Sequence, residues 1–225
     1  MRTMPSRLPP GQPAGPTDPG AVWFDSLAGK ALLDSETESI RSALHERAGQ
    51  SWLWLAPTAG DDGNHAARGL RLQVRGTGWA GPVRCGAPLP LANETVATVV
   101  IQHAAKGGSR GAALMGECAR VLVPGGRLWL YALNPLSPYR LRWRGTGLSA
   151  TEPMPWRRRL RDAGLQPDAV SLGLGPRWRV ETSAFLQQGA GLRAAWVLRA
   201  EKRSIPMTPV RQRIPLRLGD GVPAA

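Results

Sequence analysis

The chain of 225 residues is long enough to bury a sizeable core, and its 42% hydrophobic content is typical of a globular protein. Its two cysteines, Cys85 and Cys118, lack metal-ligand spacing, so neither a disulfide framework nor a zinc site is indicated, and without a run of 18 apolar residues there is no signal for a membrane-spanning helix. The formal net charge of +13 fits either a basic composition bias or an anionic partner such as nucleic acid. Without a secretion signal, the expected location is cytoplasmic.

The start of the chain divides into a leader and a helical region. Residues 1–20 are crowded with proline and predict a disordered leader, because proline fits neither a helix interior nor a ladder strand. Residues 23–48 predict one helix or two, with Leu33, Ile40 and Leu44 spaced to cover one side.

Four strands are predicted in the next 50 residues, from short apolar or alternating runs. They cover residues 51–56, 70–74, 83–85 and 95–102, and the last of these is strongly β-branched. Residues 57–69 stand where a crossover helix would join the first two strands. This segment is short and rich in turn residues, so we expect that helix to be shortened or irregular.

A helix, a tight turn and a buried strand are predicted between residues 114 and 133. Pro124 is expected to stop the helix, and the two glycines that follow it suit a sharp turn. Residues 128–133 form a run that is apolar on both faces, which favours a parallel sheet covered by helices and hence an α/β fold. The helix residues that share one face are Leu114, Cys118, Val121 and Leu122.

The last part of the chain predicts one more helix and a closing pair of strands. Trp156, Leu160 and Ala163 share a helix face that ends at Gly164. The closing strands are expected at residues 169–174 and 192–200, with a short helix possible between them. A single domain over residues 21–200 would then carry a basic, proline-containing tail at residues 201–225.

The run E-x-x-R-V-L-x-P-G-G-x-L at residues 117–128 resembles class I S-adenosylmethionine-dependent methyltransferases, the methyltransferase type 11 group especially. A subgroup of small bacterial methyltransferase-like proteins is more similar still, through L-P-L at residues 89–91, His103, N-P-L-S at 134–137 and the K-R-x-I-P-x-T run at 202–208. The resemblance implies a doubly wound, mostly parallel seven-stranded sheet, S-adenosylmethionine as cofactor and methyl transfer to an unidentified acceptor.

The same resemblance places the cofactor at the turns after the strands, where this sequence departs from the family. One glycine replaces the Gly-rich turn after the first strand, and Val74-Arg75-Gly76 stands where an acid would bind the ribose. Asp61 and Asp62 could replace that acid, or they could form a solvated turn. The positions that the resemblance assigns to the cofactor are Ala56, Thr58, Gly60, Asp61, Asp62, Cys85 and Gly86.

His103 follows the fourth predicted strand, where open α/β sheets bind their ligands, so it is a candidate general base. The alternative is a polar residue that only caps the loop. The missing acids leave two hypotheses open: an active methyltransferase, or a catalytically inactive relative that serves as a basic binding module.

A cluster of arginines and aromatic residues lies between residues 139 and 161. Arg140, Arg142 and Arg144 surround Tyr139 and Trp143, an arrangement that suits phosphate contacts with base stacking and makes nucleic acid a candidate partner. Tyr139 and Trp143 could also line a substrate pocket. For the run at residues 157–161 a solvated helix face is favoured over binding.

Overall fold

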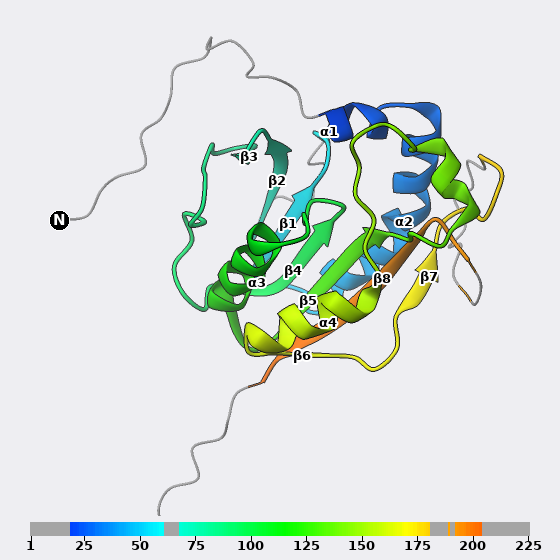
Figure 1. Cartoon of the computed structure of the whole chain (residues 1–225). Helices are drawn as coiled ribbons and strands as arrows, with labels where there is room; N and C mark the ends of the chain where they lie inside the picture. The colour runs from blue at the N-terminus through cyan, green and yellow to red at the C-terminus, as the bar shows by residue number, and fades with distance from the viewer. Residues whose placement is uncertain (1–18, 61–67, 181–188, 190–191, 204–225) are drawn as a thin grey trace, which may run out of the picture.

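The computed structural model of the protein describes residues 19–60, 68–180, 189 and 192–203 (Figure 1). Four predicted segments lie wholly or largely outside the described residues. They are most of the predicted leader, the loop with Asp61 and Asp62, much of the segment in which a last short helix was expected, and the tail from residue 204. The leader boundary changes slightly, because Pro19 and Gly20 open the first helix. Proline is well suited to a first helical turn, where its missing N–H costs nothing.

An eight-stranded mixed sheet forms the centre of the molecule, with strand order β3-β2-β1-β4-β5-β8-β6 and β7 paired to β8. The neighbours β2-β1-β4-β5 run parallel, whereas β8 is antiparallel to β5, β6 and β7. The expected doubly wound α/β fold is therefore confirmed, with a parallel centre of four strands, antiparallel edges that include β3 on β2, and eight strands instead of the seven expected. The strands are β1 (Trp52–Ala56), β2 (Gly69–Arg75), β3 (Gly78–Ala80), β4 (Val96–Gln102), β5 (Leu122–Leu133), β6 (Leu165–Pro167), β7 (Leu172–Leu174) and β8 (Ala195–Lys202).

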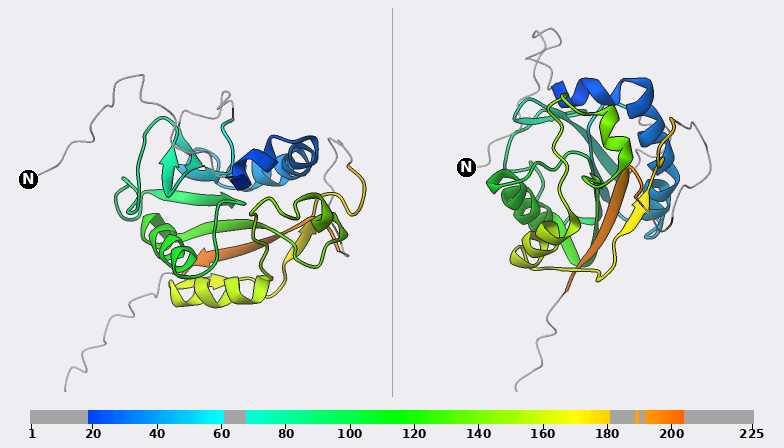
Figure 2. Two further views of the ribbon diagram at one scale, coloured as in Figure 1. Left: turned by 45° about the horizontal axis from the view of Figure 1, so that its top comes forward. Right: turned by 45° about the vertical axis from the view of Figure 1, so that its right-hand side comes forward.

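Helices cover both faces of this sheet (Figure 2). On one face lies α2 (Leu27–His45), preceded by the short α1 (Pro19–Phe24), and on the other lie α3 (Ser109–Val121) and α4 (Pro153–Asp162). Ser26 caps α2 by accepting a hydrogen bond from the Gly29 N–H, as serine does at helix starts. The two layers of helices are why the central strands are apolar on both sides.

Strand β4 shows which residues a strand buried on both faces requires. All seven of its residues are buried. Val99 and Ile101 pack in the cluster beneath α3 and α4, while Val100 packs with Ile40 of α2 on the opposite face. A β-branched run without alternation is therefore what a central parallel strand requires.

Three predicted elements differ from the structure. The third strand was expected at residues 83–85 but lies at Gly78–Ala80. Gly76, at a φ of 59°, reverses the chain there, so β3 pairs antiparallel with β2. Of the expected strand, Cys85 forms an isolated bridge to Trp79. Helix α3 ends at Val121 rather than at Pro124, and the Pro-Gly-Gly turn becomes an irregularity within β5. The strand expected at 169–174 begins only at Leu172.

The buried face of α2 also differs from the predicted one. Leu33 and Leu44 are only half-buried, whereas Leu32, Glu36 and Ile40 are buried. The helix therefore turns towards the sheet a stripe of mostly small and polar residues that includes a carboxylate.

Candidate functional site

Two adjoining cavities lie at the carboxyl ends of β1, β2 and β4. The first has a volume of about 210 Å³ and the second of about 110 Å³, and both are lined by Val74, Ala104 and Lys106. In an open α/β sheet the carboxyl ends of the strands are where ligands bind. Together the two cavities, which we call the crevice, approach the size of an ordinary small-molecule site.

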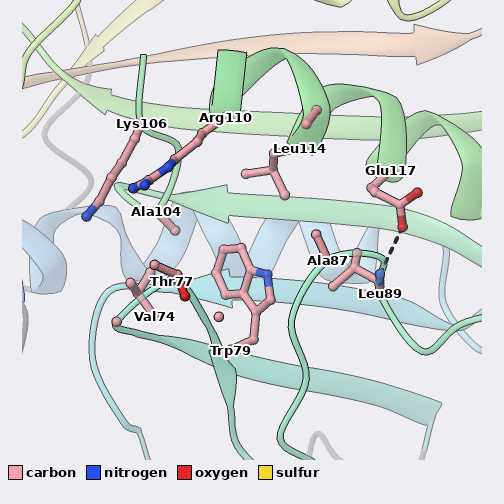
Figure 3. A pocket seen from close by; sticks show the side chains of 13 residues that line it. Val74, Thr77, Trp79, Ala87, Leu89, Ala104, Lys106, Arg110, Leu114 and Glu117 are labelled. Carbon is pink, nitrogen blue, oxygen red and sulfur yellow. Dashed lines mark hydrogen bonds between the residues drawn. The ribbon is translucent and has the colours of Figure 1, made fainter. Parts of the chain in front are cut away.

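The first cavity is an apolar slot with charged groups at its ends (Figure 3). The indole of Trp79, from β3, lies in the middle of the lining, and Leu114 projects towards it from α3. Lys106 and Arg110 lie towards one end of the slot, while Glu117 lies at the other. A flat aromatic wall with few polar groups suits a planar ring such as a nucleobase.

The carboxylate of Glu117 is already engaged. It accepts hydrogen bonds from the Arg120 guanidinium at 2.9 and 3.0 Å and from the Leu89 N–H at 2.9 Å. The Arg120 hydrogen bond holds the pKa of Glu117 below its ordinary value, assisted by that of Leu89 and opposed by partial burial. Arg120 also donates to the carbonyls of Leu89 and Leu91, so this pair fixes the loop before β4 onto α3.

The second cavity reaches from the end of β1 towards α1. Pro57, His103 and Phe24 line it, together with Ala132 and Leu133 near the end of β5. His103 directly follows β4 and has a φ of 49°, a left-handed conformation that a non-glycine residue adopts only where its surroundings impose it. The chain leaves the strand at this residue, next to the space where a ligand would meet the sheet.

A buried carboxylate on α2 holds His103 in place. Glu36 has no exposed surface, and its Oε1 lies 2.9 Å from Nε2 of His103, whose side chain is 1% exposed. The Gln102 amide donates to Oε2 of the same carboxylate at 2.9 Å. A buried carboxylate persists only when hydrogen-bonded in this way, so Glu36, Gln102 and His103 form one unit.

This pairing determines which imidazole nitrogen has a free lone pair. A carboxylate accepts hydrogen bonds, so Nε2 of His103 must carry the hydrogen, which leaves Nδ1 as the basic nitrogen of the neutral ring. Nδ1 is buried and has no hydrogen-bond partner among the described residues. The ring of Phe24 stacks over the imidazole with centroids 5.2 Å apart, so α1 covers it.

The loop after β1 holds the predicted cofactor positions Ala56, Thr58 and Gly60. Ala56 is buried at the end of β1, and the Arg71 guanidinium lies against Gly60 and 3.5 Å from the Thr58 carbonyl oxygen. Arg71 also stacks over the indole of Trp54, with 4.3 Å between its guanidinium carbon and the ring centroid. This part of the loop is thus packed against a cation, and Asp61 and Asp62 fall outside the described residues.

The other predicted cofactor positions, Cys85 and Gly86, lie beside the first cavity. The backbone of Cys85 pairs with that of Trp79 through two hydrogen bonds, of 2.7 and 3.0 Å, and Ala87, two residues further on, lines the cavity. Burial raises the pKa of the Cys85 thiol, which favours its neutral form. Cys85 and Gly86 themselves line neither cavity, whereas His103 lines the second one.

The aromatic residues near the predicted arginine cluster are not at the surface. Tyr139 and Trp143 are 1% and 3% exposed and pack in a core cluster with Trp23 and Phe24, so the expectation that they stack on bases or line a substrate pocket is wrong. Arg140, Arg142 and Arg144 are exposed around them. Among the run at 157–161, Arg157 and Arg159 are half-buried and Arg158 and Arg161 exposed, as a helix face that meets solvent would be.

Several residues of the crevice were missed in the sequence. Glu36 could have been found, because it stands four residues from both Leu32 and Ile40, a charge in an apolar stripe. Trp79, Lys106 and Arg110 carry no comparable signal. They reach the cavity through the β2–β3 reversal and the loop after β4, which local patterns do not encode.

Two features are absent from the part of the chain that the structure describes. It contains no group of three or more His, Cys, Asp or Glu side chains placed to hold a metal ion. None of its helices combines the length and apolar character needed to cross a bilayer.

No family model matches this sequence, and no curated protein matches it. Solved structures do resemble it. An S-adenosylmethionine-dependent methyltransferase from Thermotoga maritima, a possible histamine N-methyltransferase, is 14% identical with a TM-score of 0.53, covering 82% of this chain and 95% of its own. A chain from the Haloferax volcanii complex between the Trm112 methyltransferase activator and a candidate methyltransferase is 14% identical with a TM-score of 0.52, covering 82% of this chain and 97% of its own. At such identities the likeness concerns the fold, and the chain has the α/β fold of class I methyltransferases.

Proposed function

We propose that this protein is an S-adenosylmethionine-dependent methyltransferase, related to the type 11 group, that acts on an unidentified acceptor. One observation carries the proposal: a crevice at the carboxyl ends of the parallel strands joins an apolar slot around Trp79 to a buried His103–Glu36 pair. The fold of the solved methyltransferases supports it.

The residues of the crevice fit most of the cofactor. The slot between Trp79, Leu89 and Leu114 would hold the adenine ring, and Lys106, which lines both cavities, would meet the carboxylate of the methionine part. The ribose hydroxyls would need an acceptor, since Glu117 already binds Arg120 and Leu89. We assign that role to Asp61 or Asp62 in the loop after β1, with the backbone of Ala56–Gly60 beside it.

The bound cofactor would supply a methyl group activated by a sulfonium, so that the protein has mainly to orient the acceptor and accept its proton. His103 Nδ1 would take that proton from an oxygen or nitrogen nucleophile, and Glu36 would stabilise the resulting imidazolium through Nε2. Glu36 is thus a positioning residue. Because Phe24 covers the ring, α1 has to move aside for the acceptor to reach Nδ1.

The exposed Arg140, Arg142 and Arg144 would be the contacts for a nucleic-acid acceptor. With Tyr139 and Trp143 buried, binding there would depend on phosphate contacts without stacking, and its affinity should fall steeply with salt. An affinity for RNA or DNA that does not change with salt would contradict this part of the proposal.

Thermal unfolding with S-adenosylhomocysteine tests the proposed cofactor. A ligand present at 100 times its dissociation constant should stabilise the protein by about 2.7 kcal/mol. Adenosine and homocysteine supplied separately are the controls, because neither spans both cavities. No stabilisation at millimolar S-adenosylhomocysteine would contradict the proposal.

The role of His103 is tested by the formation of S-adenosylhomocysteine from S-adenosylmethionine with candidate acceptors. His103→Asn should lower turnover by about 10²- to 10⁴-fold, the usual contribution of a general base. Its affinity for S-adenosylhomocysteine should stay near that of the wild type. Unchanged turnover in this variant would assign His103 a structural role only.

A further inference from the structure

Four segments that are distant in the sequence meet at the carboxyl end of β5, beside α1 (Figures 1 and 2). The Tyr139 hydroxyl donates a hydrogen bond to the Ala28 carbonyl oxygen near the start of α2, and the Ser137 hydroxyl donates one to the Leu192 carbonyl oxygen before β8. Val180, in the loop after β7, packs against the core cluster that contains Tyr139. We call the surface that these segments form the α1 end; its segments are residues 19–28, 134–148, 176–180 and 192–195.

Large apolar side chains are exposed on each of the four segments. In the described part of the chain ten such side chains are exposed, and six of them belong to the α1 end, each between 51% and 70% exposed. Isolated exposed apolar residues are ordinary at a protein surface, whereas a concentration of them marks an interaction surface. The six are Val22, Leu27, Leu136, Leu141, Trp178 and Leu192.

Arginines accompany these apolar side chains. Arg140 and Arg142 stand on either side of Leu141 in a short 3₁₀ helix, and Arg179 follows Trp178; all three arginines are exposed. The four segments together hold six arginines and one acid, Asp25. An exposed apolar residue flanked by arginines suits a boundary between an apolar and an anionic layer, because arginine lays its stem along apolar surroundings and keeps its charge outside them.

The apolar residues favour a lipid surface over a nucleic acid as the partner. A nucleic acid would contact the arginines through its phosphates and could stack a base on Trp178, but it offers no counterpart to exposed aliphatic side chains. Five of the six apolar residues are aliphatic. A bilayer with anionic lipids offers both counterparts, because its headgroups attract arginine and its acyl boundary accepts leucine and tryptophan.

We propose that the α1 end docks on the surface of a membrane that contains anionic lipids. Leu141 and Trp178 enter the headgroup region there, and the arginines beside them contact the lipid phosphates. The surface includes α1, whose Phe24 covers His103, so a docked membrane lies beside the second cavity. The docking does not depend on the proposed methyl transfer.

Sedimentation of the full chain with lipid vesicles tests the proposal. Vesicles of phosphatidylcholine with about 30% phosphatidylserine should bind the protein at least about tenfold more tightly than vesicles of phosphatidylcholine alone, and salt at about 0.5 M should reduce this preference. Arg140→Gln should weaken binding to the anionic vesicles about fivefold, the usual contribution of one basic residue at such a surface. Leu141→Ser should weaken it by a similar factor or more, through lost apolar burial.

Met154→Ser and Arg158→Gln are the matched controls. Met154 is 66% exposed, as Leu141 is, and Arg158 is an exposed arginine; both lie on α4, outside the four segments. Each control should bind the vesicles as the wild type does. No binding to the anionic vesicles, equal binding to both kinds of vesicle, or equal losses in variants and controls would overturn the proposal. Binding to single-stranded RNA without binding to vesicles would also overturn it and assign these arginines to nucleic acid.

Discussion

Glu36 is the residue on which the candidate catalytic unit depends. It is the buried acceptor for both Gln102 and His103, so it connects α2 to the end of β4 across the sheet. A buried carboxylate with these partners is stabilising only as part of the whole unit, because each partner left alone is a buried polar group without a hydrogen bond.

Glu36→Ala should therefore lower the free energy of unfolding by about 3 kcal/mol, because it leaves two buried groups unpaired and opens a cavity. Glu38→Ala, on the same helix, is the control: Glu38 is about half exposed and, within the described part of the chain, pairs with Arg41 alone, so its loss should cost less than about 1 kcal/mol. Urea denaturation of both variants measures the difference. Equal losses would show that the buried pair contributes nothing to stability.

The buried thiol of Cys118 and the buried hydroxyl of Tyr131 predict how stability varies at high pH. Burial raises the pKa of the Cys118 thiol, with a smaller contribution from the Glu117 charge, and burial likewise raises the pKa of the Tyr131 hydroxyl. Both groups stay protonated in the folded state but lose their protons in the unfolded chain above pH values of about 8.5 and 10. These two groups therefore make their full contribution to the free energy of unfolding below pH of about 8.5, and that contribution declines as the pH rises further.

Urea unfolding between neutral pH and pH of about 10 measures this decline, which should be on the order of 1 kcal/mol per pH unit once the thiol titrates in the unfolded chain. Cys118→Ala will lower stability at every pH, yet its decline below the range where tyrosine titrates should be clearly shallower, because only the partly buried Cys85 thiol then contributes there. An equally steep decline in both proteins between pH of about 8.5 and 10 would contradict the assignment to Cys118.

At the scale of elements, helix α3 contains two glycines in different surroundings. Gly111 is buried against α4, and a Cβ built there would lie 2.3 Å from the Lys106 carbonyl oxygen and 2.9 Å from the Trp156 ring. Gly116 is exposed in the same helix and would have nothing within 4 Å. The first glycine permits close packing of α3 on α4, and the second only weakens the helix.

Gly116→Ala should therefore stabilise the protein by about 0.5–1 kcal/mol, whereas Gly111→Ala should destabilise it by more than about 1 kcal/mol, since the backbone carbonyl cannot move away freely. Chemical denaturation of the two variants gives both values. Stabilisation by Gly111→Ala would mean that α3 is not packed on α4 as described.

The elements were predicted from sequence to different extents, for physical reasons. Strands β1, β2 and β4 and helix α4 were found because their burial leaves a regular apolar pattern. Strand β3 was misplaced. The β-branched Val83 favoured a strand at residues 83–85, but the chain reversal at Gly76 pairs Trp79 with β2 instead. The cavity residues Lys106 and Arg110 could not be found, because only the loop after β4 brings them to Trp79.

On the scale of the whole molecule, the order of the strands determines where a ligand can bind. A strand that is apolar on both faces and the family resemblance suggested a parallel sheet. The sheet in turn brings segments far apart in sequence, such as Thr77, Leu89 and Arg110, around one slot. The fold could therefore be predicted from the sequence, whereas the residues that line the cavity could not. The family's motif residues are largely missing, so the crevice itself supports the proposed function better than the sequence does.

The central claim is that this crevice is the cofactor site, and calorimetric titration with S-adenosylhomocysteine tests it most directly. Leu114→Trp fills the slot opposite Trp79, and Leu141→Trp places the same side chain at a site 66% exposed and away from both cavities. Binding should be retained by the wild type and Leu141→Trp and weakened at least about 100-fold in Leu114→Trp, a difference of about 2.8 kcal/mol. Equal binding by all three proteins, or none by the wild type, would contradict the account.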